Sequence, residues 1–187
     1  MKTILDLKAN KVYPFTRIQT AAYTLLDTPI EFEGEGHIYY FPDGFGKLHS
    51  VTHILKSEGF IDDTWFNDYV RDRGSNIHLA CHLYDIDDLD DGTVGNVEAP
   101  YFAAYLKFKK ESGFVVEESE TPKANLKLMF AGTPDKIGHF PNSNLLRAGL
   151  ELHNDGSYKL IPFTDRNDLN IWRACLACYQ WKINHLK

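Results

Sequence analysis

The sequence is poor in cysteine and has no long hydrophobic run. Three cysteines occur among 187 residues, and an odd number without a pairing pattern argues against a disulfide framework. No apolar run approaches the roughly 18 residues of a transmembrane helix. The short apolar stretch at the N-terminus is interrupted by Asp6 and Lys8, which makes it a poor signal peptide. We therefore expect a cytoplasmic protein with no membrane partner.

Basic residues are also scarce, with 20 Lys and Arg against 26 Asp and Glu and a net charge of -6. Proteins that coat nucleic acid nonspecifically gain most of their affinity from basic residues, so this class is disfavoured. A nuclease is not excluded, because carboxylates that bind a metal add to the negative charge. Part of the acidity is local: "YDIDDLDDG", at 84–92, holds five aspartates and is typical of a solvated loop at a helix end.

Large apolar side chains are plentiful, since 43% of the residues are hydrophobic and 13% are aromatic. This composition is typical of a folded chain, and the length suits a single domain over 1–187. Periodicity predicts a buried strand at 4–7, a hairpin at 37–51 and strands from 114 to 163. It also predicts helices at about 16–26, from 51, within 64–85 with a break at Gly74, at 99–112 and at about 165–185. The expected fold class is α/β, a mixed central sheet flanked by helices.

Asp6 and Lys8 lie two residues apart on the first predicted strand, so both side chains point to one face of it. A carboxylate there can bind a divalent cation such as Mg²⁺, and the neighbouring ammonium can orient a water molecule or stabilise charge on a phosphate. An Asp-x-Lys pattern alone is a weak signal, because an exposed strand end gives the same letters.

The stretch "AGTPD" places Asp135 directly after a glycine and a proline. The glycine permits close backbone approach, and the proline interrupts regular strand pairing. Taken alone, the stretch is typical of a kinked edge strand with a solvated aspartate.

Taken together, six short motifs resemble the RecB-like and phage exonuclease branch of the PD-(D/E)xK nuclease superfamily. They are "SVTHIL", "RGSNIH", "AGTPD", "LDLK", "QTAAY" and "NDGSY". The resemblance implies a restriction-endonuclease-like core and a deoxyribonuclease that depends on Mg²⁺ or Mn²⁺ and is exonuclease-like. It also implies DNA as the partner and a phage or bacterial origin.

The resemblance implies roles for individual residues, each at a matching motif position. Asp135 and Asp6 would be metal-binding carboxylates, and His78 a further metal ligand. Lys8 would be the catalytic lysine. Gln19 would support catalysis, and Gln19 and Tyr23, four residues apart on a helix, would contact DNA. Arg73 is a further DNA-binding candidate.

The order of the motifs departs from the family. The Asp-x-Lys strand and the Gln-x-x-x-Tyr helix, at 1–27, precede the region 28–144 with the Gly-Thr-Pro-Asp motif, whereas in the family they follow it. The closing hairpin and last helix, at 145–187, come last. The displacement leaves open a homo-oligomer or a segment-swapped dimer. If the site is intact, the strand of Asp6 must lie beside that of Asp135, with His78 close to both.

Two other metal sites deserve consideration. His78 and His82 are spaced i, i+4 and could bind zinc, which makes a zinc hydrolase a minor alternative. Cys175 and Cys178 have the C-x-x-C spacing but lie in a predicted helix without a second pair, so core packing is favoured. Three cysteines cannot supply the four-cysteine iron–sulfur site of some relatives.

The competing functional class is a noncatalytic DNA-binding or assembly protein on a nuclease scaffold. The acidic charge favours this class, because a processive nuclease benefits from a basic groove. The set of Asp6, Lys8, His78 and Asp135 disfavours it, because a chain without catalysis has no physical need for them.

Overall fold

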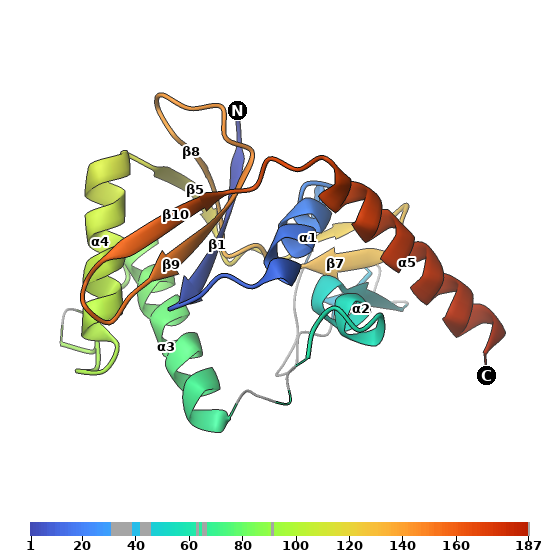
Figure 1. Ribbon diagram of the computed structural model, residues 1–187, viewed down its shortest axis with the longest axis horizontal. Helices are drawn as coiled ribbons and strands as arrows, with labels where there is room; N and C mark the ends of the chain where they lie inside the picture. The colour runs from blue at the N-terminus through green and yellow to red at the C-terminus, as the bar shows by residue number, and fades with distance from the viewer. Residues whose placement is uncertain (31–38, 42–45, 63, 65–66, 91, 187) are drawn as a thin grey trace. The chain divides into compact units, whose positions relative to one another are not determined.

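The chain forms two compact units in a computed structural model that describes residues 1–30, 39–41, 46–62, 64, 67–90 and 92–186 (Figure 1). Unit 1 consists of residues 1–13, 63–120 and 135–163. Unit 2 consists of residues 14–62, 121–134 and 164–187. The expected single domain over the whole chain stays a prediction. Among the described residues, no helix combines the length and the apolar character needed to cross a membrane.

Unit 1 is built on a five-stranded mixed sheet with the order β10-β9-β1-β8-β5. Its strands are β1 (Thr3–Ala9), β5 (Val115–Ser119), β8 (Lys136–His139), β9 (Arg147–Leu152) and β10 (Tyr158–Pro162). The central strand β1 runs parallel to β9 and antiparallel to β8. The mixed sheet expected from the sequence is therefore present, with the Asp-x-Lys strand at its centre.

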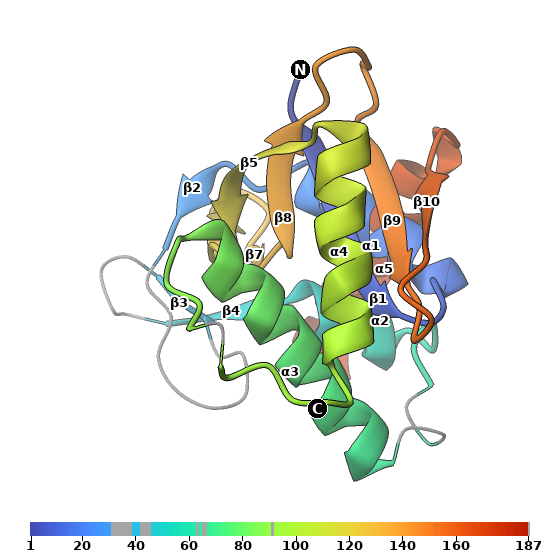
Figure 2. The same ribbon diagram turned by 90° about the vertical axis from the view of Figure 1, so that its left-hand side faces the viewer.

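Two helices cover one face of this sheet, α3 (Asp68–Asp85) and α4 (Ala99–Ser112). Figure 2 shows both lying across the strands, and contacts join α3 to β1 and β5 and α4 to β9 and β10. Gly113 ends α4 in the left-handed conformation (φ 65°), as its position after the helix predicts. The expected break at Gly74 is wrong: α3 runs through it, because a single glycine weakens a helix without interrupting it.

The core of unit 1 lies between these helices and the sheet. Leu5 and Leu7 of β1 are fully buried and pack in one cluster with Leu150 of β9 and Phe108 of α4. These leucines alternate with Asp6 and Lys8, so the apolar face of β1 turns toward the helices and the polar residues point the other way.

Unit 2 contains a second five-stranded sheet with the order β2-β6-β7-β4-β3. Its strands are β2 (Thr28–Pro29), β3 (Tyr39–Tyr40), β4 (Lys47–Ser50), β6 (Lys123–Asn125) and β7 (Phe130–Gly132). Strands β3 and β4 pair antiparallel, which confirms the predicted hairpin where it is described. Its residues 37–38 and 42–45 lie outside the described part of the chain.

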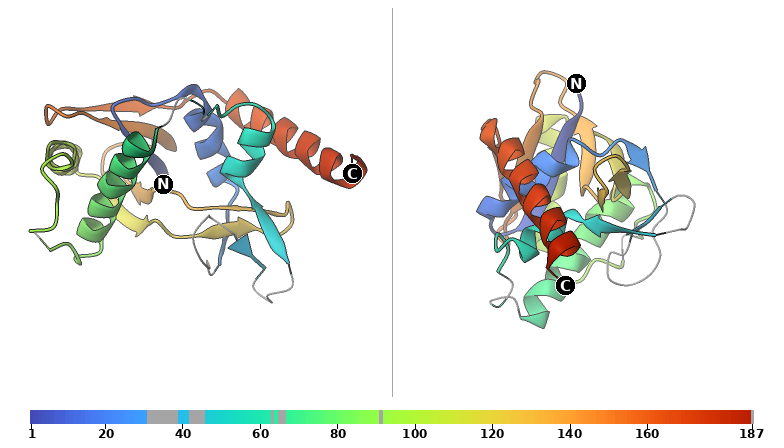
Figure 3. Two further views of the ribbon diagram at one scale, coloured as in Figure 1. Left: turned by 90° about the horizontal axis from the view of Figure 1, so that it is seen from below. Right: turned by 90° about the vertical axis from the view of Figure 1, so that its right-hand side faces the viewer.

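The helices of unit 2 are α1 (Pro14–Tyr23), α2 (Val51–Ser57) and α5 (Asn167–His185). Ser50 caps α2 by accepting a hydrogen bond from the backbone N–H of His53; of the two capping candidates in the sequence, Ser50 and Thr52, the structure uses the first. In the right-hand view of Figure 3, α5 lies in front of α1, and the two helices are in contact. Within α5, Cys175 is buried and Cys178 is exposed.

The sequence suggested that the Gly-Thr-Pro-Asp motif kinks a single strand, and this prediction is wrong. The motif separates two strands that belong to different sheets, β7 ending at Gly132 and β8 beginning at Lys136. Asp135 is therefore the residue that immediately precedes β8.

Candidate metal centre

The strand of Asp6 lies beside the strand that Asp135 precedes, as the displaced motif order requires. Residues Thr3, Ile4 and Leu5 pair with Gly138, Ile137 and Lys136, and the next step in this antiparallel register brings Asp6 opposite Asp135. The backbone N–H of Leu7 donates a hydrogen bond of 2.6 Å to Oδ2 of Asp135. The pairing forms within one chain, so it needs no exchange of segments between copies.

His78 reaches the same place from α3. Its Nε2 lies 3.0 Å from the carbonyl oxygen of Leu7, and a carbonyl can only accept, so Nε2 carries the hydrogen. In the neutral ring, Nδ1 then bears the lone pair that a metal requires. Nδ1 lies 3.7 Å from Oδ2 of Asp135 and 3.6 Å from Oε1 of Glu120. The hydrogen bond to β1 therefore holds the ring in the tautomer of a metal ligand.

Glu120 is the member of this cluster that sequence reasoning missed. Its backbone N–H donates a hydrogen bond of 3.0 Å to the carbonyl of Asp135, which places it directly across from that residue. Its φ of 49° is left-handed, an unfavourable conformation for a residue with a side chain and one that often occurs at functional sites. Ligand atoms of His78, Glu120 and Asp135 all lie within 4.8 Å of one another.

Asp6 adds a buried carboxylate next to this group. Its side chain is 1% exposed, and burial raises its pKa to about 6, with Lys8 opposing the rise and Asp135 adding to it. Lys8 forms an ion pair with Oδ1 of Asp6. Apart from this contact with Lys8, the carboxylate oxygens of Asp6 have no hydrogen-bond donor among the described residues. In the described part of the chain, Oε1 of Glu120 is approached only by Nδ1 of His78, at 3.6 Å.

The neighbouring carboxylates raise the pKa of both Lys8 and His78. Burial by itself lowers the pKa of Lys8, but the carboxylates of Asp6 and Asp135 outweigh it and the net shift is upward. Burial likewise lowers the pKa of His78, and Asp135 and Glu120 reverse that effect. Upward pKa shifts of Lys8 and His78 and a nearly fully buried carboxylate at Asp6 all reflect an excess of negative charge, which a bound cation would relieve.

The donor set suits a divalent transition metal or magnesium. Carboxylate oxygens bind Mg²⁺ and Mn²⁺, and an imidazole nitrogen favours Mn²⁺ or Zn²⁺ over Mg²⁺. His82 is not a member of this group; its Nδ1 lies 2.8 Å from Oγ of Ser119. The arrangement therefore supports the site with His78 and Asp135 more than it supports a zinc pair of His78 and His82.

Gln19 and Tyr23 contact each other in unit 2, on helix α1. The side-chain amide of Gln19 donates a hydrogen bond of 2.8 Å to the hydroxyl of Tyr23. A Cβ added at Gly132 would lie 2.6 Å from Cε1 of Tyr23. The glycine of the Gly-Thr-Pro-Asp motif therefore makes room for the tyrosine of the Gln-x-x-x-Tyr motif. The roles of Gln19 in catalysis and of both residues in DNA binding stay predictions.

Arg73 lies on α3 with its guanidinium over two aromatic rings. The distances to the ring centroids are 5.7 Å for Tyr69 and 5.5 Å for Tyr101. These ring contacts say nothing about DNA, and the predicted contact of Arg73 with DNA stays a prediction.

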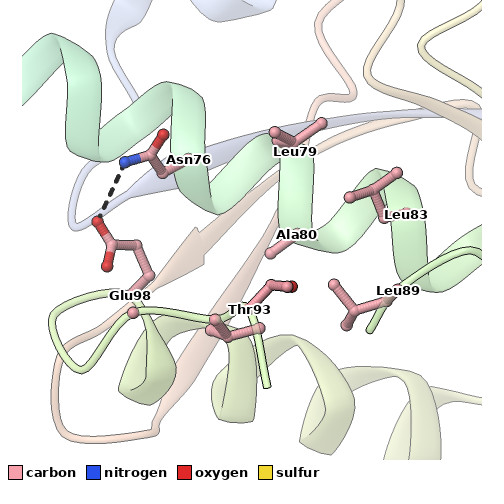
Figure 4. Close-up of a pocket in the computed structure, with 9 residues that line it drawn as sticks. Asn76, Leu79, Ala80, Leu83, Leu89, Thr93 and Glu98 are labelled. Atoms are coloured by element: carbon pink, nitrogen blue, oxygen red, sulfur yellow. Dashed lines mark hydrogen bonds between the residues drawn. The ribbon is translucent and has the colours of Figure 1, made fainter. Parts of the chain in front are cut away.

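Unit 1 also has a pocket of about 410 Å³ beside α3 (Figure 4). Its lining is mostly apolar, including Leu79, Leu83 and Leu89, with Asn76 donating a hydrogen bond of 3.4 Å to Glu98 at one side. None of the residues of the candidate metal centre lines this pocket, so a ligand bound in it would not contact that centre.

Known proteins give no independent identification of the chain. No family model, no curated protein and no solved structure matches the chain. The case for this candidate centre is therefore made by the positions and chemistry of its own residues: a buried aspartate paired with a partly exposed lysine, beside a histidine and two further carboxylates.

Proposed function

We propose that the chain is a metal-dependent deoxyribonuclease that hydrolyses phosphodiester bonds in an exonuclease-like manner. The observation that carries the proposal is the convergence of His78, Glu120 and Asp135 within 4.8 Å, beside the ion pair of buried Asp6 with partly exposed Lys8. Carboxylates, an imidazole and one lysine in a single cluster are the groups that metal-assisted phosphodiester hydrolysis needs. The resemblance to RecB-like nucleases supports the same reading, including a restriction-endonuclease-like core.

His78, Glu120 and Asp135 would hold Mg²⁺ or Mn²⁺. Asp6, which the resemblance names as a ligand, lies outside this group of three, and its charge acts on Asp135 and His78 from beside it. When bound, such an ion polarises the phosphate and lowers the pKa of a coordinated water. Leu7 fixes two of the ligands through its backbone, since its N–H binds Asp135 and its carbonyl accepts from His78.

Lys8 and Asp6 take different roles in the proposed reaction, because one is a cation and the other a carboxylate. The raised pKa of Lys8 keeps the ammonium protonated at neutral pH, so Lys8 acts as a hydrogen-bond donor that orients the water and stabilises negative charge on the phosphate. The pKa of Asp6, at about 6, lies close to neutral pH, which suits a carboxylate that accepts a proton from the attacking water.

A cleavage assay tests the proposal. The purified protein is incubated with linear, nicked and single-stranded DNA and with RNA, in Mg²⁺, in Mn²⁺ and in EDTA. We expect cleavage of DNA in either metal, none in EDTA, and none with Asp135→Asn. The matched control is Asp72→Asn, which removes an exposed carboxylate from the same helix as His78 and should cleave normally.

Absence of metal-dependent cleavage on every substrate would count against the nuclease. DNA binding that is unchanged in Asp135→Asn, without cleavage by the parent protein, would favour the noncatalytic DNA-binding protein, which the net charge of -6 also favours.

A further inference from the structure

Two polar residues adjoin the metal ligands in sequence and form a second cluster. Ser119 precedes Glu120, Lys136 follows Asp135, and the two are paired in the register of β5 and β8. Nζ of Lys136 donates a hydrogen bond of 2.6 Å to Oγ of Ser119. This bond therefore ties together the ends of the two strands from which Glu120 and Asp135 project.

The same cluster reaches α3, the helix that carries His78. Nζ of Lys136 lies 2.9 Å from Oδ2 of Asp85, and Nδ1 of His82 lies 2.8 Å from Oγ of Ser119. His78, His82 and Asp85 follow one another at helical spacings of four and three residues, so they share one side of α3. One side of the helix therefore supplies a metal ligand and both contacts to the strands.

Stability alone does not account for the pair of Lys136 and Asp85. Both side chains are 0% exposed, and a fully buried ion pair contributes little net stability compared with apolar residues of similar volume. What such a pair can supply is a fixed geometry for the elements that it joins, as outer contacts do around many metal sites.

We propose that Lys136 is a positioning residue for the metal centre. By joining Ser119 of β5 to Asp85 of α3 from its place on β8, it fixes the three elements that carry Glu120, His78 and Asp135. This inference rests on the proposed function for the identity of the ligands. It concerns their spacing, which is a property of the protein before DNA binds.

The test measures Mn²⁺ binding without DNA, by calorimetry and by the electron paramagnetic resonance signal of free Mn²⁺. We expect Lys136→Met to weaken Mn²⁺ affinity by about 10-fold to 100-fold. Lys109→Met is the matched control, because Lys109 binds the same carboxylate of Asp85 (3.1 Å) from α4, outside the three elements that carry the ligands. It should bind Mn²⁺ like the parent protein.

A double variant separates positioning from folding. Asp85→Leu with Lys136→Met replaces the ion pair by apolar side chains. In a Tyr105→Phe background, which removes the hydroxyl bonded to Asp85, it should restore thermal stability relative to Lys136→Met alone. The affinity for Mn²⁺ should stay low in this stable protein. His82 still joins Ser119 to α3, but Lys136 no longer joins β8, which Asp135 precedes, to β5 and α3. A stable double variant that binds Mn²⁺ like the parent would overturn the inference.

The outcomes also distinguish this inference from the proposed function. If the parent protein binds Mn²⁺ but cleaves no nucleic acid, the proposed nuclease function is contradicted. The Mn²⁺ affinities of the variants would then still decide the positioning role of Lys136. Cleavage by the parent protein together with equal Mn²⁺ affinity in all variants would break the positioning role alone.

Discussion

Unit 1 contains two clusters of charged side chains, and they differ in burial and in how their charges are matched. In the candidate metal centre, which is partly buried, three carboxylates lie near one lysine and one histidine, and Oδ2 of Asp6 has no hydrogen-bond partner among the described residues. In the cluster around Asp85, a single carboxylate accepts from the hydroxyl of Tyr105 at 2.6 Å and from two lysines.

The difference shows that burial of charge does not by itself indicate a functional site. Asp85 is fully buried and fully supplied with donors, so nothing further is needed to hold its charge. The candidate metal centre has more negative charge than its own cations balance, which is the condition that a bound metal ion would relieve.

The largest effect is expected on catalysis from Lys8→Met. Loss of a group that stabilises charge on the reacting phosphate lowers the rate by about 10²-fold to 10³-fold. Mn²⁺ should bind at least as tightly as in the parent protein, because a cation next to the site has been removed. Cleavage rates and Mn²⁺ titrations measure the two effects separately.

The control for this change is Lys11→Met, which removes an exposed lysine just after β1 and should leave the rate unchanged. Equal losses of rate in both variants would mean that Lys8 acts only through the overall charge of the surface.

The next effect is expected on folding from Asp85→Ala. This change leaves the buried ammonium of Lys136 without its carboxylate, which typically costs about 3–5 kcal/mol of unfolding free energy. Urea denaturation followed by circular dichroism measures it. Asp88→Ala, in the same acidic segment but at an exposed position, should change the unfolding free energy by less than about 0.5 kcal/mol. A similar cost for both would mean that the segment acts through its total charge.

Asp6→Asn should stabilise the protein in EDTA at neutral pH. The folded state raises the pKa of Asp6 from 3.8 to about 6, so folded protein binds this proton more tightly than unfolded protein. The stability contributed by this group is complete below about pH 4 and is lost as the pH rises toward 6. Removing the charge should therefore recover about 1–3 kcal/mol at pH 7.5.

Denaturation at pH 4 and at pH 7.5 checks this sign. The gain from Asp6→Asn should be present at pH 7.5 and absent at pH 4, where the carboxyl of the parent protein is already neutral. A gain at both values would show that Asn packs better than Asp for reasons unrelated to charge.

The smallest effect is expected from Ser119→Ala. It removes the hydroxyl that binds Lys136 and His82 but keeps the ion pair of Lys136 with Asp85. The loss should be about 1–2 kcal/mol of unfolding free energy, since one of the hydrogen bonds involves a charged group. Ser75→Ala, at an exposed position of α3, should have almost no effect, and an equal loss there would indicate a general effect on the helix.

Local sequence signals predicted much of the secondary structure. The alternation in β1, the capping serine Ser50 and the terminal Gly113 each act within a few residues, so the sequence around them is sufficient. The turn "NDGS" likewise predicted the hairpin of β9 and β10, in which Gly156 takes a φ of 78°. The position of β1 between β8 and β9 depends on contacts across more than a hundred residues, and the prediction that it lies beside Asp135 came from the resemblance to a family.

Glu120 could not be identified from the sequence because of a bulge in β5. The register shifts between Val116 and Glu118, so simple alternation along "VVEESE" gives the wrong residue opposite Asp135. Three glutamates occur in that stretch, and only the bulge selects Glu120. Asp135 was identified only through the resemblance to a family, because the Gly-Thr-Pro-Asp stretch taken alone indicated a solvated aspartate.

Asp85 was misread for a related reason. The five aspartates of 84–92 suggested a solvated loop, but Asp85 is the last residue of α3 and its side chain is 0% exposed. Composition describes a segment as a whole, whereas a buried ion pair depends on one residue and on a lysine fifty-one positions away at Lys136.

The central place of β1 has a consequence for how the protein is made. Its neighbours in the sheet, β8 and β9, begin at Lys136 and Arg147, so the ribosome completes β1 long before either partner exists. At about 5–20 residues per second, β1 waits roughly 7 to 30 seconds, and during that time Leu5 and Leu7 have no sheet to enter. Unpaired apolar strands of this kind are the segments that chaperones protect. The strand that organises the candidate metal centre is thus synthesised well before its neighbours in the sheet and is among the last to reach its native contacts.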